Sequence, residues 1–327
     1  MASPAIGAKS YMQFGREAVW GTAVAATKRL GIIRHSVKTE MVQVKDPTLT
    51  GDFIQRGIFN VLERAVGQIE MFMTYTELLM FLDAVMGAGT FGSNGGTTTG
   101  AGPFTHVFVE REFYNSFTIE LIEGNIPANK CQRVLGAKIK QLTIKGDGGD
   151  ICRVILDIVG KQKQLTQTPT VGLSAAAPLL ALAYHATAFV DGSGDTGLNM
   201  VVKSFEFSIL NGMDDMRKNA GTQYIDEPIR NDVSRATMKF KKEFRTVNVP
   251  TLYISGASVA PTLQLANGLG QTFTFQIDAG VITSYDQPTD GFGIQFQDVT
   301  VESILSSGSP NYGAKMTAVN SQATINT

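Results

Sequence analysis

The glycine-rich stretch GSGDTG (Gly192–Gly197) comes nearest to a nucleotide-binding motif in this sequence. The pattern G-x-G-x-x-G holds a pyrophosphate only where a helix begins within it, because the first helical amides bind the phosphate oxygens. Asp214 lies near the distance at which such sites carry an acidic residue. The next residues, LNMVVKSFEF, alternate polar and apolar and therefore predict a strand. We therefore interpret the stretch as a glycine turn. A calcium loop is also disfavoured, because the glycine falls at the wrong position and no glutamate closes a twelve-residue loop.

The histidines and cysteines do not have the spacing of a metal site. His35, His106 and His185 are scattered, and the sequence contains neither His-x-x-His nor Cys-x-x-Cys. The two cysteines, Cys131 and Cys152, do not make a disulfide framework, and Cys152 lies on an apolar strand face with Val154, Leu156 and Ile158. We therefore predict no metal, and a buried reduced thiol at Cys152.

The remaining polar groups do not combine into a catalytic set. No G-x-S-x-G is present, and Asp147 and Asp150 flank a turn, where aspartate commonly bonds to the local backbone. The pair Asp214–Asp215 lies in a polar loop and is interpreted as solvated. We predict no catalytic residues, no cofactor and no enzymatic activity.

A basic cluster, KFKKEFR (Lys239–Arg245), is the one candidate for nucleic-acid contact. On a strand its charges divide between two faces, so a solvated or interface face is the alternative. The whole chain has 327 residues and a net charge of −1, which disfavours a strongly basic nucleic-acid reader. Its 43% hydrophobic content supports one large or two ordinary domains with a real core. The first residues lack the apolar region of a signal peptide, and no stretch is long enough to cross a bilayer, so we expect no membrane partner.

The elements that would position these residues are mostly strands. In the first half we expect strands at 31–42, 61–73, 105–110 and 116–122, and a hairpin of 137–145 with 151–160. A helix is predicted after Thr74 or Thr76, ending at Gly87. The 31–42 strand has an apolar face of Ile33, Val37 and Met41, and its other face is polar.

The second half repeats this order. Strands are expected at 201–210 and 235–244, and the segment VPTLYISG stands where the first half has its helix. We also expect a closing hairpin, in which 272–277 and 292–297 each point phenylalanine inward. In this interpretation the inward residues of the hairpin are Phe273, Phe275, Ile277, Phe292, Ile294 and Phe296, and Gln295 and Gln297 point outward.

We interpret this repetition as a tandem duplication. The resulting division is an N-terminal arm (1–30), domain 1 (31–163), a linker or insert (164–199), domain 2 (200–305) and a C-terminal tail (306–327). The predicted fold class is mainly β, a β-sandwich or partial barrel with a short flanking helix.

The arrangement resembles the major tail tube proteins of long-tailed bacteriophages. The stretch EAVWGTAVAAT (Glu17–Thr27) is similar to the Glu…Tyr-Gly-Thr-Ala opening of one tube family, with Trp20 in place of the tyrosine. The segments IIRHSVKTE, LTGDFIQRG and GQIEMFM, the helix and the hairpin follow in the family's order, over about 15–305. The insert at 165–191 and the residues past Ser306 are not accounted for.

The resemblance implies a β-sandwich related to the type VI secretion tube, whose inner sheets join edge to edge in stacked rings. Such a virion tail protein assembles in the host cytoplasm and encloses genomic DNA and the tape-measure protein, with tail terminator and baseplate proteins as further partners. If the duplication holds, three chains form a pseudo-sixfold ring, which we favour over a hexamer. The expected lumen residues are Arg34, Ser36, Lys38, Glu40, Gln141, Thr143, Ser204, Glu206, Ser208, Thr274, Gln276 and Gln295. The expected inter-ring contacts lie in Asp46–Asn60 and Asn211–Asp232, with Asp46, Asp52, Arg56, Asp214, Asp215 and Arg217.

Two other functions remain open at this point. The first is another virion component, such as a tail terminator, baseplate hub or capsid-decorating protein. The second is a carbohydrate-binding β-sandwich, which would need exposed aromatic residues on a concave face, whereas the phenylalanines here fall on the buried phase.

Overall fold

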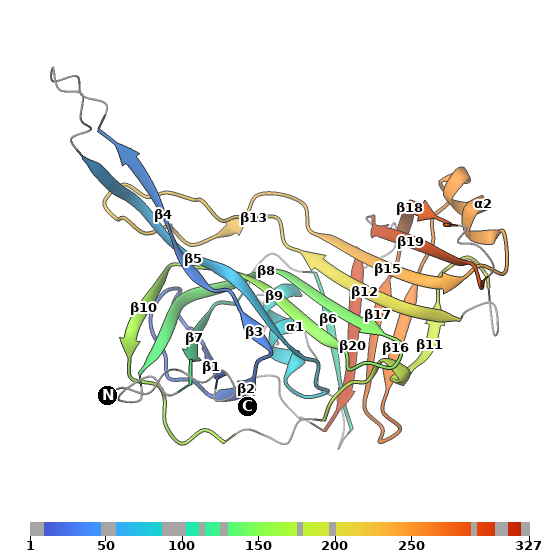
Figure 1. Ribbon diagram of the computed structural model, residues 1–327, viewed down its shortest axis with the longest axis horizontal. Helices are drawn as coiled ribbons and strands as arrows, with labels where there is room; N and C mark the ends of the chain where they lie inside the picture. The colour runs from blue at the N-terminus through green and yellow to red at the C-terminus, as the bar shows by residue number, and fades with distance from the viewer. Residues whose placement is uncertain are drawn as a thin grey trace.

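Two packed β-sheets make up most of the molecule (Figure 1). The computed structural model describes residues 10–46, 57–86, 103–110, 115–124, 130–174, 179–195, 201–288, 293–304 and 313–321. Within these ranges the strands form a thirteen-stranded sheet, a five-stranded sheet and a small two-stranded sheet, and none of them closes into a barrel. The predicted mainly β, sandwich-like fold is confirmed.

The large sheet contains strands from both halves of the chain. The first half supplies β1 (Tyr11–Arg16), β2 (Lys28–Gly31), β3 (Arg34–His35), β4 (Lys38–Lys45), β5 (Ile58–Phe72), β7 (Phe117–Ile122), β8 (Cys131–Asp147), β9 (Arg153–Gly160) and β10 (Gln162–Gln167). The second half supplies β12 (Val202–Leu210), β15 (Arg235–Glu243), β18 (Gly280–Asp286) and β19 (Phe296–Ser303).

The small sheet has the order β11-β16-β17-β20-β6. Its members are β11 (Ala186–Val190), β16 (Thr262–Ala266), β17 (Thr272–Ile277), β20 (Ala314–Asn320) and β6 (Phe104–Val109). The two-stranded sheet pairs β13 (Met213–Asp214) with β14 (Ile229–Arg230).

Strand β8 connects the two halves. Its first part pairs with β7 and β10, and its second part pairs with β9 on one side and β12 on the other. The β8–β9 pair is the predicted hairpin, and its turn contains Gly149 at a φ of +92°, a conformation that glycine adopts without strain. Because β12 pairs directly with β8, the sheet runs without a break from one half of the chain to the other.

The core lies between the two sheets and confirms most of the predicted alternation. Phe207 and Ile209 on β12 are fully buried, as are Phe273, Phe275 and Ile277 on β17. The rings of Phe207 and Phe275 meet across the sheets with centroids 5.2 Å apart. Each buried phenylalanine contributes about 1.5–3 kcal/mol relative to an exposed one, so these contacts fix the packing of the sheets.

Two α-helices flank the sheets in the described residues. Helix α1 (Leu78–Met86) occupies the predicted place and is buried along its whole length. The hydroxyl of Thr74, one of the two expected caps, accepts the N–H of Glu77 just before the helix. Helix α2 (Asn248–Ser255) contains most of VPTLYISG and ends at Gly256 in a left-handed conformation, but only Val249 of its residues is buried.

The predicted closing hairpin is wrong. Strand β17 pairs with β16 and β20 in the small sheet, whereas β19 pairs with β15 and β18 in the large sheet. The phase of β19 is also reversed, because Gln297 is 0% exposed and Ile294 is 69% exposed. Val299 and Val301 are buried opposite Phe240 and Met238, so the odd-numbered residues of β19 face the core. The even-numbered alternation of Phe292 to Phe296 is out of phase with them. Phe292 lies outside the described residues.

Other segments differ in smaller ways. The expected strand at 31–42 is divided among β2, β3 and β4, and of its predicted apolar face only Val37 is buried. Strands β1 and β20 lie in the predicted N-terminal arm and C-terminal tail, so both terminal segments contribute to the sheets. The insert contributes β11 and a 3-10 turn at Ala183–His185. The division into domains stays a prediction.

Candidate functional site

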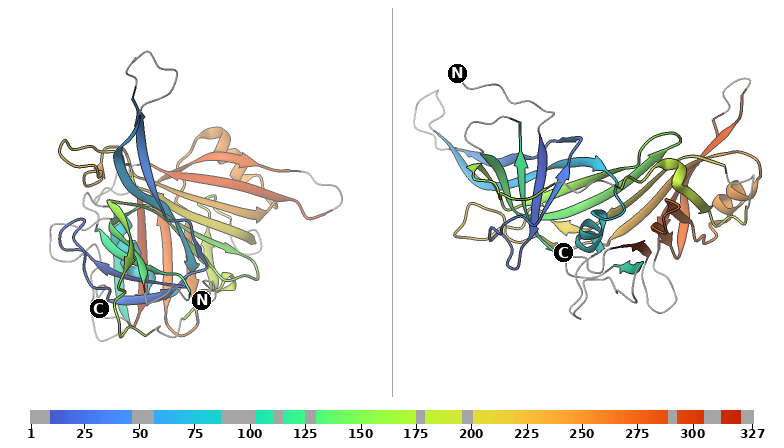
Figure 2. Two further views of the ribbon diagram at one scale, coloured as in Figure 1. Left: turned by 60° about the vertical axis from the view of Figure 1, so that its left-hand side comes forward. Right: turned by 90° about the horizontal axis from the view of Figure 1, so that it is seen from below.

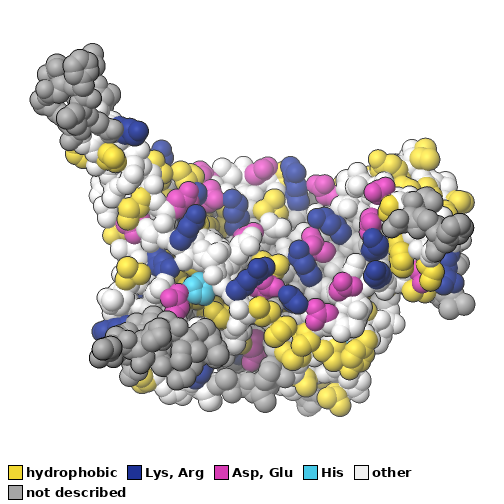
Figure 3. Space-filling view, viewed as in Figure 1, with side chains coloured by type: hydrophobic (Ala, Val, Ile, Leu, Met, Phe, Trp, Pro, Cys, Tyr) yellow, Lys and Arg dark blue, Asp and Glu magenta, His cyan; other side chains and the backbone are white. Residues whose placement is uncertain are grey.

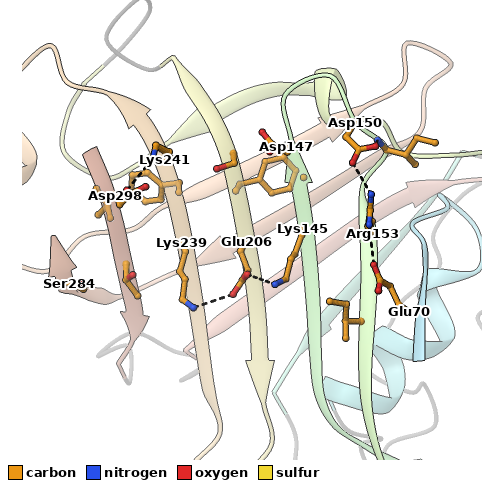
Figure 4. A pocket seen from close by; sticks show the side chains of 18 of the residues that line it. Glu70, Lys145, Asp147, Asp150, Arg153, Glu206, Lys239, Lys241, Ser284 and Asp298 are labelled. Atoms are coloured by element: carbon orange, nitrogen blue, oxygen red, sulfur yellow. Dashed lines mark hydrogen bonds and ion pairs between the residues drawn. The ribbon is translucent and has the colours of Figure 1, made fainter. Parts of the chain in front are cut away.

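The outer face of the large sheet is polar and charged over most of its width. Side chains from β3, β5, β8, β9, β12, β15, β18 and β19 line one shallow hollow of about 550 Å³, so it crosses both halves of the chain. Its lining includes five Lys or Arg and six Asp or Glu residues. Figure 3 shows the two charge types interspersed across this face, and Figure 4 shows the hollow from close by.

Ion pairs neutralise much of this charge locally. Glu206, on the central strand β12, lies between Lys145 at 2.9 Å and Lys239 at 3.2 Å (Figure 4). Burial alone would raise the pKa of Glu206, but the hydrogen bonds and charges of the two lysines outweigh it and lower the pKa. Glu206 therefore stays ionised, and it joins strands β8, β12 and β15 electrostatically.

A second set of pairs continues this pattern toward both sides. The buried carboxylate of Glu70 binds Arg34 and, at 3.4 Å, Arg153, which also binds Asp150 at 3.1 Å. On the other side Lys241 pairs with Asp298 at 3.3 Å. The face thus presents alternating, mutually paired charges and not a field of one sign.

The structure divides the residues expected to line a lumen. Nine share the outer face of the large sheet: Arg34, Ser36, Lys38, Glu40, Gln141, Thr143, Ser204, Glu206 and Ser208. Thr274 and Gln276 lie on β17, on the outer face of the small sheet and therefore on the opposite side of the sandwich. Gln295 precedes β19, where its carbonyl accepts from the Phe244 N–H and its side chain from Gln287. The twelve residues therefore do not share one surface.

The two excursions expected between rings behave differently. Strands β4 and β5 form a long hairpin that projects from the body of the molecule (Figures 1 and 2). Asp46 directly follows β4 and is the last described residue before the connection to β5. Asp52 and Arg56 lie outside the described residues. The hairpin exposes the apolar residues Met41, Val44, Ile58, Phe59 and Val61, with Phe59 60% exposed.

The second excursion, 211–234, folds back onto the base of this hairpin. The Glu63 N–H donates to the Gln223 carbonyl, and Asp215 pairs with Lys140 at 2.8 Å and Arg64 at 3.3 Å. Arg217 pairs with Asp226 at 3.2 Å, and Asp214 accepts the Met216 N–H. These expected inter-ring groups are thus engaged within the chain.

The motif EAVWGTAVAAT forms a clasp at the start of the fold. The Glu17 carboxylate accepts hydrogen bonds from the N–H groups of Gly21 and Gly136 and the hydroxyls of Ser116 and Thr118, all at 2.8–2.9 Å. The Trp20 indole donates to the Gly136 carbonyl at 2.9 Å. At Gly136, with a φ of +65°, a Cβ would lie 2.7 Å from the Trp20 nitrogen. These contacts hold the N-terminal segment against β7 and β8.

Residues 192–194 of the GSGDTG stretch form a bend, and the described part of the stretch takes part in a buried ionic cluster. Asp191, just before it, and Asp195 within it both bind the ammonium of Lys242, which is 0% exposed. The sequence alone did not reveal this cluster, because the run KFKKEFR indicated a solvated or interface face for Lys242. A signal was present, since Lys242 continues the buried phase of Ala236, Met238 and Phe240 on β15.

The groups considered for metal binding do not come together. His35 pairs with Glu123 at 3.2 Å, and the His185 ring contacts the Tyr75 hydroxyl at 3.1 Å. Over the described ranges no cluster of His, Cys, Asp or Glu could hold a metal ion. Both cysteines are free and buried, and burial raises the pKa of the Cys152 thiol to about 12. The helices that the structure describes are too short or too polar to span a membrane.

Fold and surface together define a β-sandwich with a broad outer face of mutually paired charges, in which β4 and β18 are terminal strands of the described pairings. The described part of this face lacks the grouped acid, base or nucleophile of an active site. A family model described as phage tail tube protein matches residues 7–241, well over half of the chain. The chain belongs to this family, and it is a structural subunit of a phage tail tube that assembles with itself. No curated protein matches the sequence.

Proposed function

We propose that three copies of this chain close into a ring, with the outer polar face of the large sheet lining the bore. The repeated strand order of this sheet is the observation that carries the proposal. Its first half has the spatial order β4-β5-β9-β8, and its second half has β12-β15-β19-β18. Along the chain, each half begins with two paired strands, β4 with β5 and β12 with β15. A helix follows, α1 or α2, and a hairpin comes later, β8–β9 or β18–β19.

The junction inside the chain supplies a model for the junction between chains. Strand β8 ends the first unit and pairs antiparallel with β12, which begins the second unit. Strand β18 ends the second unit, and β4 begins the first. In the proposal β18 of one copy lies beside β4 of the next, so that the ring satisfies both open edges. Two units per chain favour three chains over six.

The charge pattern of the large-sheet face supports passage of DNA. A bore rich in unpaired Lys and Arg would hold phosphates through counterion release. Here Lys145 and Lys239 are paired with Glu206, and Lys241 with Asp298. In the proposal these pairs form the wall past which genomic DNA and the tape-measure protein move, and Thr274 and Gln276 lie on the outside of the tube.

Ring stacking is assigned to the projecting β4–β5 hairpin, with the 211–232 excursion beside it. Exposed apolar side chains such as Phe59 favour a contact with another copy, because water would otherwise cover them. We place the tail terminator and baseplate proteins at the two ends of the tube and assembly in the host cytoplasm. The proposed role is structural, and the chain acts on no substrate other than itself.

Electron microscopy and native mass spectrometry of the purified protein test this proposal. Rings or tubes with threefold symmetry, and a ring mass of three chains, are the expected result. Sixfold rings of six chains would contradict the proposed junction but not the tube. A stable monomer that forms neither rings nor tubes, even with its virion partners, would contradict the ring proposal as a whole.

A further inference from the structure

The cluster of Lys242, Asp191 and Asp195 is sealed from solvent. The side chains of Lys242 and Asp191 are 0% exposed, and that of Asp195 is 2% exposed. Gly192 packs closely against the segment between α2 and β16. A Cβ at this position would lie 2.7 Å from the Ala260 nitrogen. The rings of Phe189 and Phe240, two residues before Asp191 and Lys242, contact each other with centroids 4.9 Å apart. Two carboxylates thus share one ammonium in a site without bulk water, which is a costly arrangement for a purely ionic contact.

The two carboxylates have different surroundings. Oδ1 of Asp191 accepts the Ser193 N–H at 2.8 Å and the Ser193 hydroxyl at 2.6 Å, and its Oδ2 contacts Nζ of Lys242. Oδ2 of Asp195 lies 2.8 Å from the same Nζ. The Thr246 hydroxyl and the Asn248 amide, both at 2.7 Å, hold Asp195 in place. Burial alone would raise the pKa of Asp195, but the hydrogen bonds from Lys242 and Thr246 outweigh it and lower the pKa.

We propose that Lys242 and Asp191 are a modification site, at which the chain forms an intramolecular isopeptide bond between Nζ and Cγ with Asp195 as the base. Lys242 first passes one proton to Oδ2 of Asp191, and the resulting amine attacks Cγ. Asp195 accepts a second proton from Nζ and returns it to Oδ2 as the Cγ–Oδ2 bond breaks. One water leaves, Nζ keeps one hydrogen as the amide N–H, and Asp195 is again a carboxylate. The step requires no oxidant, reductant or further reactant.

The surroundings supply what this condensation needs. The two Ser193 donors lie against Oδ1, where negative charge develops when the amine attacks Cγ, so they act as an oxyanion hole. The fold holds nucleophile and acceptor in contact, which gives an effective concentration that free side chains do not reach. Burial then favours the amide, because the site excludes the water that would hydrolyse it and removes the buried charge pair.

The bond would join the two layers of the sandwich. Asp191 directly follows β11 of the small sheet, and Lys242 lies on β15 of the large sheet (Figure 1). A covalent link here would prevent the sheets from separating at the end of the molecule that carries α2. The inference rests on the buried cluster alone and does not depend on the proposed ring.

Intact mass spectrometry of the folded, purified full-length protein tests the proposal. The expected mass is lower than that of the sequence by one water, and proteolysis should release a branched peptide that contains both Asp191 and Lys242. The full sequence mass, with both residues recovered in linear peptides, would overturn it.

Matched variants separate this bond from other reactions. Lys242→Arg keeps the charge but offers no acylatable amine, and Asp195→Asn keeps the shape but removes the base, so both should retain the full mass. Lys241→Arg, on the exposed neighbour, should still lose one water. An aspartimide between Asp191 and Gly192 would also lose water, but that loss would survive Lys242→Arg and yield linear peptides, and this result would refute the isopeptide.

Discussion

At the scale of single residues, the most densely bonded polar groups of this protein are structural. Glu17 is nearly buried and gathers four hydrogen bonds from three separate segments of the chain. These bonds give a physical reason for the combination of Glu17, Trp20 and Gly21 in the N-terminal motif. The glutamate satisfies buried donors, and Trp20 covers Gly136, where a side chain would collide with the indole.

Replacing Glu17 should therefore destabilise the fold. Glu17→Ala leaves buried donors of Ser116 and Thr118 without this acceptor, and we expect a loss of about 3 kcal/mol in the free energy of unfolding. Glu302→Ala is the control, since Glu302 is 37% exposed and lies 3.8 Å from Arg235, and it should cost about 0.5 kcal/mol or less. Urea unfolding of both variants measures the difference. Equal midpoints would show that the clasp contributes little to stability.

At the scale of elements, the β4–β5 hairpin is the part of the structure least explained by the chain's own packing. Five apolar side chains along it are at least 46% exposed. Exposed apolar residues that cluster on one projecting element indicate an interaction surface, whereas single ones are common on any protein. The proposed ring stacking would bury these residues against another copy.

A charge on this hairpin should block assembly without unfolding the subunit. Phe59→Asp places a carboxylate at a position that is 60% exposed in the single chain but buried in the proposed stack. Its unfolding free energy should change by about 0.5 kcal/mol or less, because surface substitutions are mostly neutral. Sedimentation and electron microscopy should nevertheless show no long tubes.

The control is Val171→Asp, a similar change at a residue that is 84% exposed and follows Thr170, which bonds to Ala26 and Glu120, two residues outside the hairpin. This variant should form tubes of normal length. If Phe59→Asp also formed normal tubes, ring stacking would have to use another surface.

At the scale of the whole molecule, the sandwich has two outer faces, and only one can line a bore. The large-sheet face carries the paired charges and spans both halves of the chain. The small-sheet face carries Thr274, Gln276 and Lys315, which lie side by side on β17 and β20. The same substitution on each face distinguishes them.

Thr300→Lys adds a positive charge to the large-sheet face, beside Lys239 and opposite Ser284. In virions that carry this variant we expect slower DNA release at low salt, and recovery at higher salt, because the added charges attract phosphates and salt screens them. Fluorescence of a DNA-binding dye during triggered ejection measures the rate.

Thr274→Lys makes the same change on the small-sheet face and should release DNA at the normal rate. Slow release with this variant, and normal release with Thr300→Lys, would show that the small sheet lines the bore.

The sequence by itself determined strands β12, β15 and β17 with their buried faces, the β8–β9 hairpin and the place of the first helix. Alternation is a local property, and the phase of Phe205 to Ile209 or Phe273 to Ile277 depends only on neighbouring residues. The bend at 192–194, within the expected glycine turn, also followed from the glycines themselves.

The tertiary structure decided which strands lie side by side and therefore which polar faces share a surface. Thr274 and Glu206 have the same local pattern, yet they lie on opposite sides of the molecule because their strands belong to different sheets. The burial of Lys242 likewise required Asp191 and Asp195, which approach it only in the folded chain. Strand pairing and ionic contact join residues distant in the sequence, and local alternation carries no information about such distances.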